Sequence, residues 1–389
     1  MTVLKANCQK RRKTVRMSCI GKDRTNGALC KLTVLLIYSI QLKTDGDSLL
    51  KKTICLIAVA AVLTSCGNYS ADEQVSQTIF AMDTYMTVTA YTDGCGTEKA
   101  SAAVSECLDE IARLDKLWNV NDAQSDFARI NGGGKATVSA DTAELISFAL
   151  DMNEKTGGAL DITLLPVLRE WGFTTGEYRV PDDDTLAALR ENIGSDKVTL
   201  SGNTVSVQKG TMITPGAVAK GITGDIVSEI MRKNGVSSAM IDLGGNIQTV
   251  GKKPGGSYWK IGLKDPRGQG IFGTVEISDM AVVTSGGYER YFEQDGAAYW
   301  HILDPKTGRP AQSGIISATV IGGEGSLCDA LSTAFFVMGE QQTEDYWRRS
   351  GGFDFVLVTD DDRVIISEGI KDRYTSNGLY GEPEVICFE

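Results

Sequence analysis

Residues 273–303 read GTVEISDMAVVTSGGYERYFEQDGAAYWHIL, and YWKIGL precedes them at residues 258–263. β-Branched and aromatic residues recur in these runs, which predicts three consecutive β segments at 258–263, 273–283 and 288–303. Glycine-rich turns rather than helices join the segments, so neighbouring strands should pair locally and run antiparallel. We therefore predict an α+β fold with mainly antiparallel sheet flanked by helices.

Patterns on both sides of this stretch supply the remaining elements. Ser139 stands where a helix N-cap is expected, and Gly157 stands where that helix should end. Predicted helices cover 98–117, 140–155, 217–234 and 326–338, and further β segments cover 77–91, 198–207, 237–242, 315–321 and 353–367. No internal repeat or obvious linker occurs beyond residue 78, so we predict a single domain at 78–389.

The composition is that of a globular chain, and the residues after position 65 are strongly acidic. The 389 residues are 42% hydrophobic and 23% charged, which is enough apolar material to bury a core. Residues 1–65 hold 12 Lys and Arg against 3 Asp and Glu, leaving 27 basic and 47 acidic residues beyond. Such an excess of acidic residues repels phosphate backbones, and no basic stripe with interleaved aromatics is present, so no nucleic acid partner is expected.

The N-terminal region predicts export and lipid anchoring. Two lysines at positions 51 and 52 precede an apolar run at 54–63, which is too short to span a bilayer but suits a secretory signal peptide. The ending Leu63-Thr64-Ser65-Cys66 resembles a bacterial lipobox, in which the cysteine is lipidated. We expect a lipoprotein signal peptide at 51–65, a lipid anchor on Cys66, a polar tether at 66–77, and a location on the extracytoplasmic face of the cell membrane.

Residues 1–50 are basic and lie too far upstream for an ordinary signal peptide, so we interpret them as an extension or an artefact of start-site assignment. Five of the nine cysteines lie at or before Cys66. The other four show no metal-type spacing, and the sequence leaves open whether Cys95 and Cys107 form a disulfide.

The strongest local signal for chemistry is SLCDALSTAFF at residues 326–336. Asp329 and Thr333 are four residues apart, so a helix places both oxygens on one face, near its first turn. A carboxylate beside a hydroxyl suits Mg²⁺, which takes few protein ligands and completes its shell with water and phosphate oxygens. The alternative is ordinary capping, with an acidic residue in the first turn of a helix.

Two glycine-containing loops could contact a ligand. In TPGAVAKGITGD (residues 214–225), small residues allow close approach and Lys220 adds a positive charge before a helix, although a helix start with a surface lysine explains the same letters. In KTGGALDITLLP (residues 155–166), glycines lie beside Asp161, with Trp171 and Phe173 shortly after. These residues could hold a flat ring, or they could form a helix cap next to core aromatics.

His301 is the only histidine of the chain. Because the pKa of imidazole lies nearest neutrality, His301 is the single histidine candidate for proton transfer at pH 7. Taken alone, it is better explained as a core or turn histidine before Asp304-Pro305.

Taken together and in this order, the segments resemble the ApbE family of FAD:protein FMN transferases over residues 78–385. The matching segments are Met82-Asp83-Thr84, Trp118-Asn119, 125–131, 156–163, 171–173, 217–221, Asp225, 242–246, 284–286, 301–310 and 329–333. The resemblance implies Mg²⁺-dependent transfer of FMN from FAD to a Ser or Thr hydroxyl of an acceptor protein, with release of AMP. The implied acceptor is an extracytoplasmic electron-transfer subunit or flavoprotein that carries a short Ser/Thr motif.

The resemblance also implies roles for individual residues. Asp329 and Thr333, with the main-chain oxygen of Ala217, would bind Mg²⁺, and His301 would be the base that activates the acceptor hydroxyl. Contacts to FAD would come from Met82, Asn121, Ala159, Leu160, Asp161, Thr214, Lys220 and Leu303. Two positions depart from the family pattern: Thr214 stands where many relatives have Asp, so a contact there lacks charge, and Asp83 stands where Gly is frequent.

Two other functions are compatible with the same residues. If water replaced the protein hydroxyl, the same base and metal would make the chain a Mg²⁺-dependent FAD pyrophosphatase. A non-catalytic flavin-binding lipoprotein is the other alternative, but it would need no base at His301.

Overall fold

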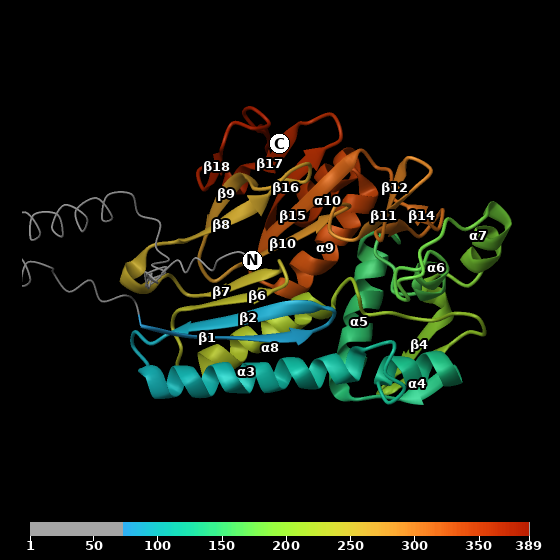
Figure 1. Ribbon diagram of the computed structural model, residues 1–389, viewed down its shortest axis with the longest axis horizontal. Coiled ribbons are helices and arrows are strands. Elements are labelled where there is room, and N and C mark those ends of the chain that lie inside the picture. Colours follow the sequence, from blue (N-terminus) through green and yellow to red (C-terminus); the bar gives the residue numbers. More distant parts are fainter. Residues whose placement is uncertain (1–72, 389) are drawn as a thin grey trace, which may run out of the picture. The chain divides into compact units, whose positions relative to one another are not determined.

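The computed structural model describes residues 73–388, which fall within one compact unit (Figure 1). The predicted extension, signal peptide and lipid anchor at Cys66 lie outside the described residues. Among the described helices, none combines the length and apolar character needed to cross a bilayer.

A nine-stranded sheet forms the centre of this unit. Its strands stand in the order β1 (Gln74–Ala81), β2 (Thr84–Tyr91), β6 (Ala239–Leu243), β7 (Ile247–Val250), β10 (Ala281–Gly286), β15 (Ile315–Gly322), β16 (Phe353–Thr359), β17 (Val364–Ser367) and β19 (Glu384–Ile386). Every neighbouring pair is antiparallel except β17 and β19. The predicted α+β class with mainly antiparallel sheet is therefore confirmed.

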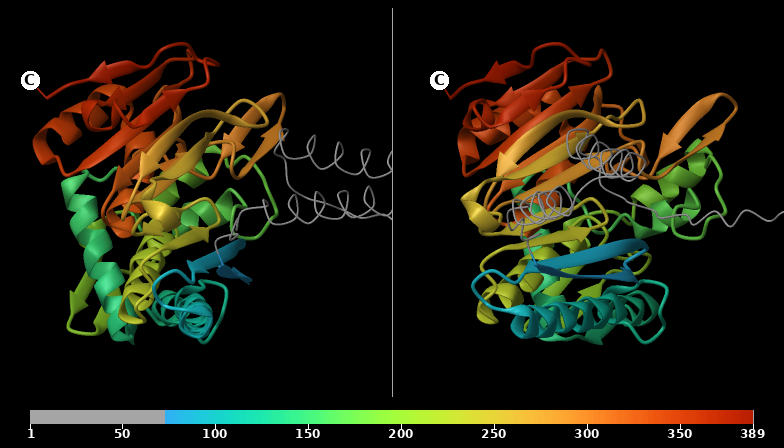
Figure 2. Two further views of the ribbon diagram at one scale, coloured as in Figure 1. Left: turned by 90° about the vertical axis from the view of Figure 1, so that its left-hand side faces the viewer. Right: turned by 60° about the vertical axis from the view of Figure 1, so that its left-hand side comes forward.

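Helices cover one face of this sheet, and a small sheet covers part of the other (Figures 1 and 2). On the helical face, α3 (Thr97–Trp118) and α8 (Ala219–Lys233) pack on β1, β2, β6 and β7, while α9 (Gly325–Met338) and α10 (Glu340–Ser350) pack on β10, β15 and β16. The small sheet has the order β18 (Tyr374–Ser376), β9 (Ile271–Ile277) and β8 (Trp259–Lys264).

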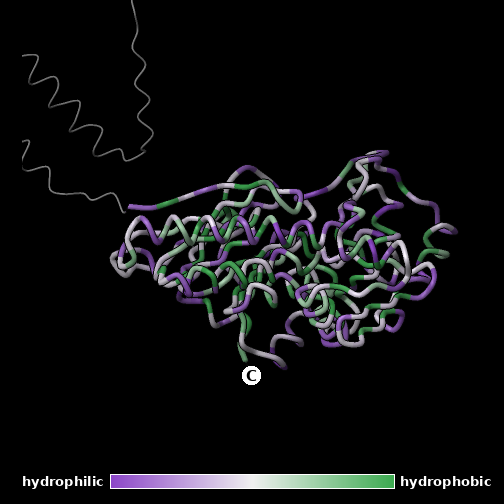
Figure 3. The backbone as a smooth tube through the Cα atoms, turned by 90° about the horizontal axis from the view of Figure 1, so that it is seen from below, coloured by the Kyte–Doolittle hydropathy of each residue, from purple (hydrophilic) through white to green (hydrophobic). Residues whose placement is uncertain are grey.

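Strand β16 contributes alternate residues to the two cores on either side of the large sheet. Phe355 and Leu357 belong to the core under the helices, whereas Val356 and Val358 belong to the core under the small sheet. This alternation is the period of two that a strand buried on both faces requires. Figure 3 shows hydrophobic stretches running through the interior of the described part, with hydrophilic turns around them.

The remaining elements surround one end of the large sheet. They are α4 (Asp126–Gly133), α5 (Ala140–Lys155), α6 (Leu165–Glu170), α7 (Asp183–Arg190), the sheet of β3 (Lys135–Thr137), β5 (Thr204–Val207) and β4 (Val198–Ser201), and the hairpins β11 (Tyr291–Gln294) with β12 (Ala297–Trp300) and β13 (Leu303–Asp304) with β14 (Arg309–Pro310). Three 3-10 turns lie at Ser195–Lys197, Pro254–Gly256 and Glu368–Ile370. A separate cluster of buried apolar side chains, including Trp171 and Leu303, holds α6 and α7 to these hairpins.

The segment predicted as one strand at 77–91 is instead a hairpin. The chain reverses at Met82 and Asp83, whose φ angles of 49° and 61° are positive. The Met82 N–H donates to Asp115 Oδ1 at 3.0 Å, so a residue of α3 holds the turn. Strand β1 also begins at Gln74, so residues 74–77 belong to the sheet rather than to the predicted tether.

Other predicted boundaries also change. Segment 273–283 is divided between β9 and β10, which belong to two different sheets, because the chain turns at Asp279 with a φ of 51°. Segment 288–303 likewise forms three short strands rather than one. Helix α9 begins at Gly325, so Asp329 lies in its second turn, not its first. Cys95, Cys107, Cys328 and Cys387 are all free, which answers the open question about a disulfide.

Candidate active site

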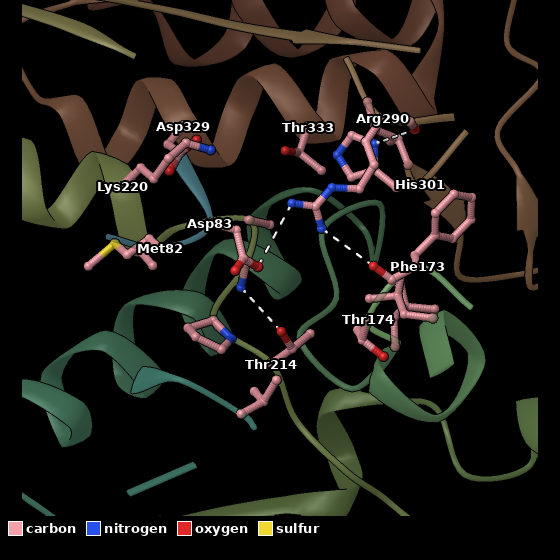
Figure 4. Close-up of a pocket in the computed structure, with 18 of the residues that line it drawn as sticks. Met82, Asp83, Phe173, Thr174, Thr214, Lys220, Arg290, His301, Asp329 and Thr333 are labelled. Carbon is pink, nitrogen blue, oxygen red and sulfur yellow. Dashed lines mark hydrogen bonds and ion pairs between the residues drawn. The ribbon is translucent and has the colours of Figure 1, made fainter. Parts of the chain in front are cut away.

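A cavity of about 290 Å³ opens where α8 and α9 begin, facing the β1–β2 turn. It is lined by most of the predicted site residues: Met82, Asn121, Ala159, Asp161, Thr214, Ala217, Lys220, His301, Leu303, Asp329 and Thr333. Figure 4 labels Met82, Thr214, Lys220, His301, Asp329 and Thr333 among them. Leu160 is the exception, because its side chain is fully buried in the core and does not line the cavity. Its carbonyl accepts a hydrogen bond from Asn153 Nδ2 at 2.7 Å instead.

Helices α8 and α9 cap each other at this cavity. The carboxylate of Asp225 in α8 accepts from the N–H groups of Gly325 at 2.6 Å and Ser326 at 2.9 Å, where α9 begins. The carboxylate of Asp329 in α9 accepts from the Gly221 N–H at 2.8 Å, in the first turn of α8. Asp225 therefore caps α9, and the alternative interpretation of Asp329 as a simple cap of its own helix is wrong.

Gly221 is required by this close contact. A Cβ atom there would meet the Gly325 carbonyl oxygen and come within 2.6 Å of Asp329 Cβ. Any larger side chain would push α8 away from α9, because atoms at that distance repel. The close contact at Gly221 therefore fixes the distance between α8 and α9, and with it the position of the Asp329 carboxylate.

Three oxygen atoms of the cavity, two from α9 and one from the residues just before α8, fit a hard cation. Asp329 is 4% exposed, and burial raises its pKa against the opposing effects of Lys220 and the Gly221 N–H. Thr333 Oγ1 lies 3.2 Å from Ser285 Oγ. The Ala217 carbonyl is not bonded by any backbone N–H of the described residues, because the Gly221 N–H that would reach it in a regular helix donates to Asp329.

The chemistry of these donors decides which kind of metal ion the cavity could bind. Residues 73–388 contain no group of three or more His, Cys, Asp or Glu side chains that could hold a metal. One carboxylate, one hydroxyl and one carbonyl are all oxygen ligands, which Mg²⁺ prefers over nitrogen or sulfur. The residues present therefore fit Mg²⁺ with few protein ligands, and do not fit a zinc centre.

The ring of His301 is oriented by the backbone of Arg290. Nδ1 lies 3.2 Å from the Arg290 carbonyl oxygen, and the His301 N–H donates to the same oxygen at 3.1 Å. A carbonyl can only accept, so Nδ1 carries the proton and Nε2 keeps its lone pair. Burial, together with the positive charges of Arg290 and Lys220, lowers the pKa of His301 to about 4, so the imidazole is neutral at pH 7.

Aromatic rings support the wall that carries His301. Phe173 lines the cavity and meets the His301 ring edge-on, with centroids 6.3 Å apart. Trp171 does not line the cavity, because its indole is fully buried and its Nε1 donates to the Gly308 carbonyl at 2.8 Å. Of the aromatic pair singled out in the sequence, Phe173 faces the cavity and Trp171 belongs to the core.

Two other residues predicted to contact FAD, Asp161 and Thr214, differ from each other because only Asp161 has an ionisable side chain. Asp161 accepts from the Thr163 N–H at 2.7 Å, and burial raises the pKa of its carboxyl. Thr214 lies on the cavity, and its hydroxyl accepts from the Gly216 N–H at 3.4 Å. Thr214 therefore brings hydrogen-bonding capacity without the charge that an Asp would add at this position.

Three charged residues of the cavity, Arg290, Glu289 and Asp115, were not predicted from the sequence. Arg290 lies 3.9 Å from the Asp83 carboxylate and donates to the Phe173 carbonyl at 3.5 Å, so it bridges two parts of the rim. Glu289 also lines the cavity, and burial raises its pKa while Lys220 opposes that shift. Both follow the glycine turn at 284–287, which was a usable signal. Asp115 had no such signal, because it is one of many charged residues in α3.

The cavity has the composition of an enzyme active site. A neutral imidazole with a free nitrogen, a lysine and a buried carboxylate converge on one cavity. The family model described as "ApbE family" matches residues 82–357. The chain therefore belongs to the ApbE family, and it is an enzyme of the flavin-transferase class.

Individual relatives agree with this membership. The FAD:protein FMN transferase of Treponema pallidum is 32% identical over 82% of this chain and 93% of the relative, and that of Vibrio cholerae is 32% identical over 74% and 88%. Among solved structures, the ApbE protein from Thermotoga maritima aligns with a TM-score of 0.73 at 30% identity, covering 77% of this chain and 99% of that one. The flavin transferase ApbE from Vibrio cholerae gives a TM-score of 0.69 at 27% identity, with coverage of 77% and 99%.

Proposed function

We propose that this enzyme transfers FMN from FAD to a Ser or Thr hydroxyl of an acceptor protein, using Mg²⁺ and releasing AMP. The observation that carries the proposal is the neutral imidazole of His301, held by the Arg290 carbonyl in the cavity that Lys220 and Asp329 also line. A protein that only stores flavin needs no proton acceptor at this position. A transferase needs one, because a neutral hydroxyl is a poor nucleophile.

The proposed step follows from these positions. The acceptor hydroxyl gives its proton to Nε2 of His301 while its oxygen forms a bond to the phosphorus of the FMN half of FAD. The bond from that phosphorus to the bridging oxygen breaks, and its electron pair leaves with AMP. The Arg290 carbonyl accepts from Nδ1–H throughout and so stabilises the imidazolium that forms. Lys220 supplies a positive charge close to the diphosphate.

The predicted metal site supports the same reaction. Asp329 and Thr333 of α9 and the Ala217 carbonyl, just before α8, would hold Mg²⁺ in the cavity. When bound, Mg²⁺ neutralises charge on a diphosphate and makes AMP a better leaving group. The fixed Asp329 carboxylate reduces the reorganisation needed when the cation binds.

The test uses the full chain in detergent with FAD, MgCl₂ and membranes from cells that lack this gene. We expect a protein band with flavin fluorescence that survives denaturing electrophoresis, release of AMP, and loss of both on addition of EDTA. Free FMN and AMP without a fluorescent band would instead indicate a pyrophosphatase. Bound but uncleaved FAD would indicate a flavin-binding lipoprotein.

We also propose that the protein is anchored by lipid at Cys66 on the extracytoplasmic face of the membrane, where its acceptor would be an electron-transfer subunit or flavoprotein. The support lies in the sequence: two lysines and the apolar run at 54–63 precede Leu63-Thr64-Ser65-Cys66, which resembles a bacterial lipobox. Labelling with a radioactive fatty acid should be lost in Cys66→Ala, and retained label would refute the anchor.

A further inference from the structure

Two aromatic side chains stand exposed beside the cavity. Phe80 and Tyr85 are 61% and 73% exposed, and Tyr85 is the most exposed large hydrophobic residue among residues 73–388. They face each other across the β1–β2 pair, with ring centroids 5.2 Å apart in an edge-to-face arrangement. The two rings contact each other and remain largely open to solvent.

This aromatic pair lies at the rim of the cavity. Only Ala81 and Thr84 separate the two rings from Met82 and Asp83, both of which line the cavity. The hydrogen bond from the Met82 N–H to Asp115 fixes the turn against α3. A ligand that contacts the aromatic pair can therefore continue directly into the cavity.

Strand β1 also offers an unpaired edge. It is the first strand of the nine-stranded sheet, and among residues 73–388 it pairs only with β2. In an antiparallel pair, alternate residues direct their N–H and C=O groups away from the partner strand, so β1 presents free backbone groups along its outer side. Its sequence QVSQTIFA contains no charged residue and no proline, the usual protections against edge pairing.

The exposed face of the hairpin changes character along its length. Away from the cavity the facing residues are hydroxyl pairs, with Thr78 and Thr87 joined at 2.8 Å and Ser76 and Thr89 at 2.8 Å. Phe80 and Tyr85 form the apolar pair of this face next to the cavity, whereas Tyr91 at its far end packs against Trp259. Exposed aromatics gathered at one place on a surface are typical of a protein-binding site.

We propose that an extended segment of the acceptor protein adds to the free edge of β1 and packs apolar side chains on Phe80 and Tyr85. This inference rests on the proposed function, because it assigns the surface that presents the acceptor hydroxyl to the cavity. A folded acceptor cannot enter a cavity of about 290 Å³, so it must offer its hydroxyl on a protruding segment. Strand addition supplies affinity through backbone hydrogen bonds, and the aromatic pair supplies side-chain selectivity.

The charges at this rim argue against a lipid surface as the occupant. Asp83 is an exposed carboxylate at the tip of the hairpin, and the nearby Arg290 lies within ion-pair distance of it. An anionic membrane would be repelled by Asp83 and would find no unpaired cation within the β1–β2 hairpin itself, Gln74–Tyr91, which contains neither Lys nor Arg.

The test compares the double variant Phe80→Ala/Tyr85→Ala with wild type and with the matched control Tyr258→Ala. Tyr258 is 48% exposed and immediately precedes Trp259, which contacts Tyr91 at the opposite end of the β1–β2 hairpin. Full-length proteins in detergent are mixed with FAD, MgCl₂ and membranes from cells lacking this gene. Initial rates of covalent flavin fluorescence are recorded against the amount of membrane protein and, separately, against FAD.

We expect the double variant to need about tenfold more membrane protein for half-maximal rate, the change that a loss of about 1.4 kcal/mol produces. Its FAD concentration for half-maximal rate and its acceptor-free release of FMN should match wild type, and Tyr258→Ala should match wild type throughout. An unchanged membrane-protein requirement in the double variant, or an equal change in Tyr258→Ala, would overturn the inference.

Two further outcomes distinguish a docking surface for the acceptor from a surface with another occupant. If wild type itself gives no covalent flavin band, the proposed function fails rather than the docking surface. If the double variant keeps its membrane-protein requirement but loses binding to vesicles of lipids extracted from those membranes, or loses a dimer seen by light scattering, the surface belongs to lipid or to a second copy and the inference is overturned.

Discussion

Two walls of the same cavity are built in different ways. The wall made by α8 and α9 is a pair of helices joined by reciprocal carboxylate caps from Asp225 and Asp329. The other wall is made of short hairpins and loops, where His301 depends on the Arg290 carbonyl and on packing against Phe173. Hydrogen bonds between α8 and α9 hold the first wall together. The second wall consists of strands of two to four residues and the loops between them.

The difference matches the two tasks of the proposed reaction. A cation and a diphosphate need fixed ligands, because electrostatic stabilisation is strongest when the dipoles are already oriented. A proton acceptor must meet a hydroxyl that arrives on another protein, so it lies on the wall that continues to the rim beside Asp83. If the two walls are independent, a substitution in one should leave the function of the other intact.

The largest effect is expected from His301→Ala. Transfer should fall by about 10³-fold, because a positioned general base contributes about 10² to 10⁴. FAD affinity, measured by quenching of flavin fluorescence, should stay close to that of wild type, since the α8–α9 wall is untouched. Added imidazole should restore part of the rate. Near-normal transfer by this variant would show that His301 is not the base.

Asp329→Asn should lower transfer by about 10²-fold at limiting Mg²⁺, because it removes the only carboxylate among the proposed metal ligands. The Asn side chain can still accept from the Gly221 N–H, so the fold should survive. The measurement is the Mg²⁺ concentration that gives half-maximal rate.

The matched control for this prediction is Asp225→Asn in the neighbouring helix. Asp225 does not line the cavity, but it caps α9. The substitution should therefore lower the free energy of unfolding by about 0.5–2 kcal/mol through the weakened cap. Its Mg²⁺ requirement should be that of wild type. Equal Mg²⁺ requirements in the two variants would contradict the assignment of Asp329.

Gly221→Ala tests whether the helical wall is as tightly packed as its contacts indicate. The added methyl group meets the Gly325 carbonyl, so we expect a loss of about 1–3 kcal/mol in the free energy of unfolding. Denaturant unfolding with and without FAD provides the measurement. Gly132→Ala in α4, where a Cβ has no neighbour within 4 Å, should be neutral or slightly stabilising and serves as the control.

The smallest effect concerns pH. His301 acts as a base only when neutral, and its lowered pKa of about 4 means that its protonation should reduce the rate only as pH falls toward that value, not near 6.5. Arg290→Gln removes a positive charge that lowers this pKa, while the residue 290 carbonyl remains. The acidic limb of the rate profile should therefore move to higher pH. An unmoved limb would show that Arg290 does not influence the titrating group.

The features predicted correctly from sequence depend on neighbours along the chain. Asp329 and Thr333 share a face because they are four residues apart in a helix, and the Ser139 side chain caps α5 by accepting from the Thr142 N–H, as its position predicted. The hairpin at Met82 and Asp83 was missed because Met82 is not a usual turn former, and its positive φ is held by Asp115 from a distant helix. The family resemblance assigned Leu160 to an FAD contact, but its side chain lies in the core, because position in a motif does not decide which way a side chain faces.

By itself the sequence determined the α+β class, the antiparallel pairing and the segments that meet at the site, because these follow from local periodicity, turn residues and an ordered set of family motifs. Only the tertiary structure decided that Asp225 caps α9, that Arg290 orients His301, and that Phe80 and Tyr85 stand at the rim. These contacts join residues that are distant in the chain or lie on different strands. Their formation depends on the packing of whole elements, which no local pattern of residues records.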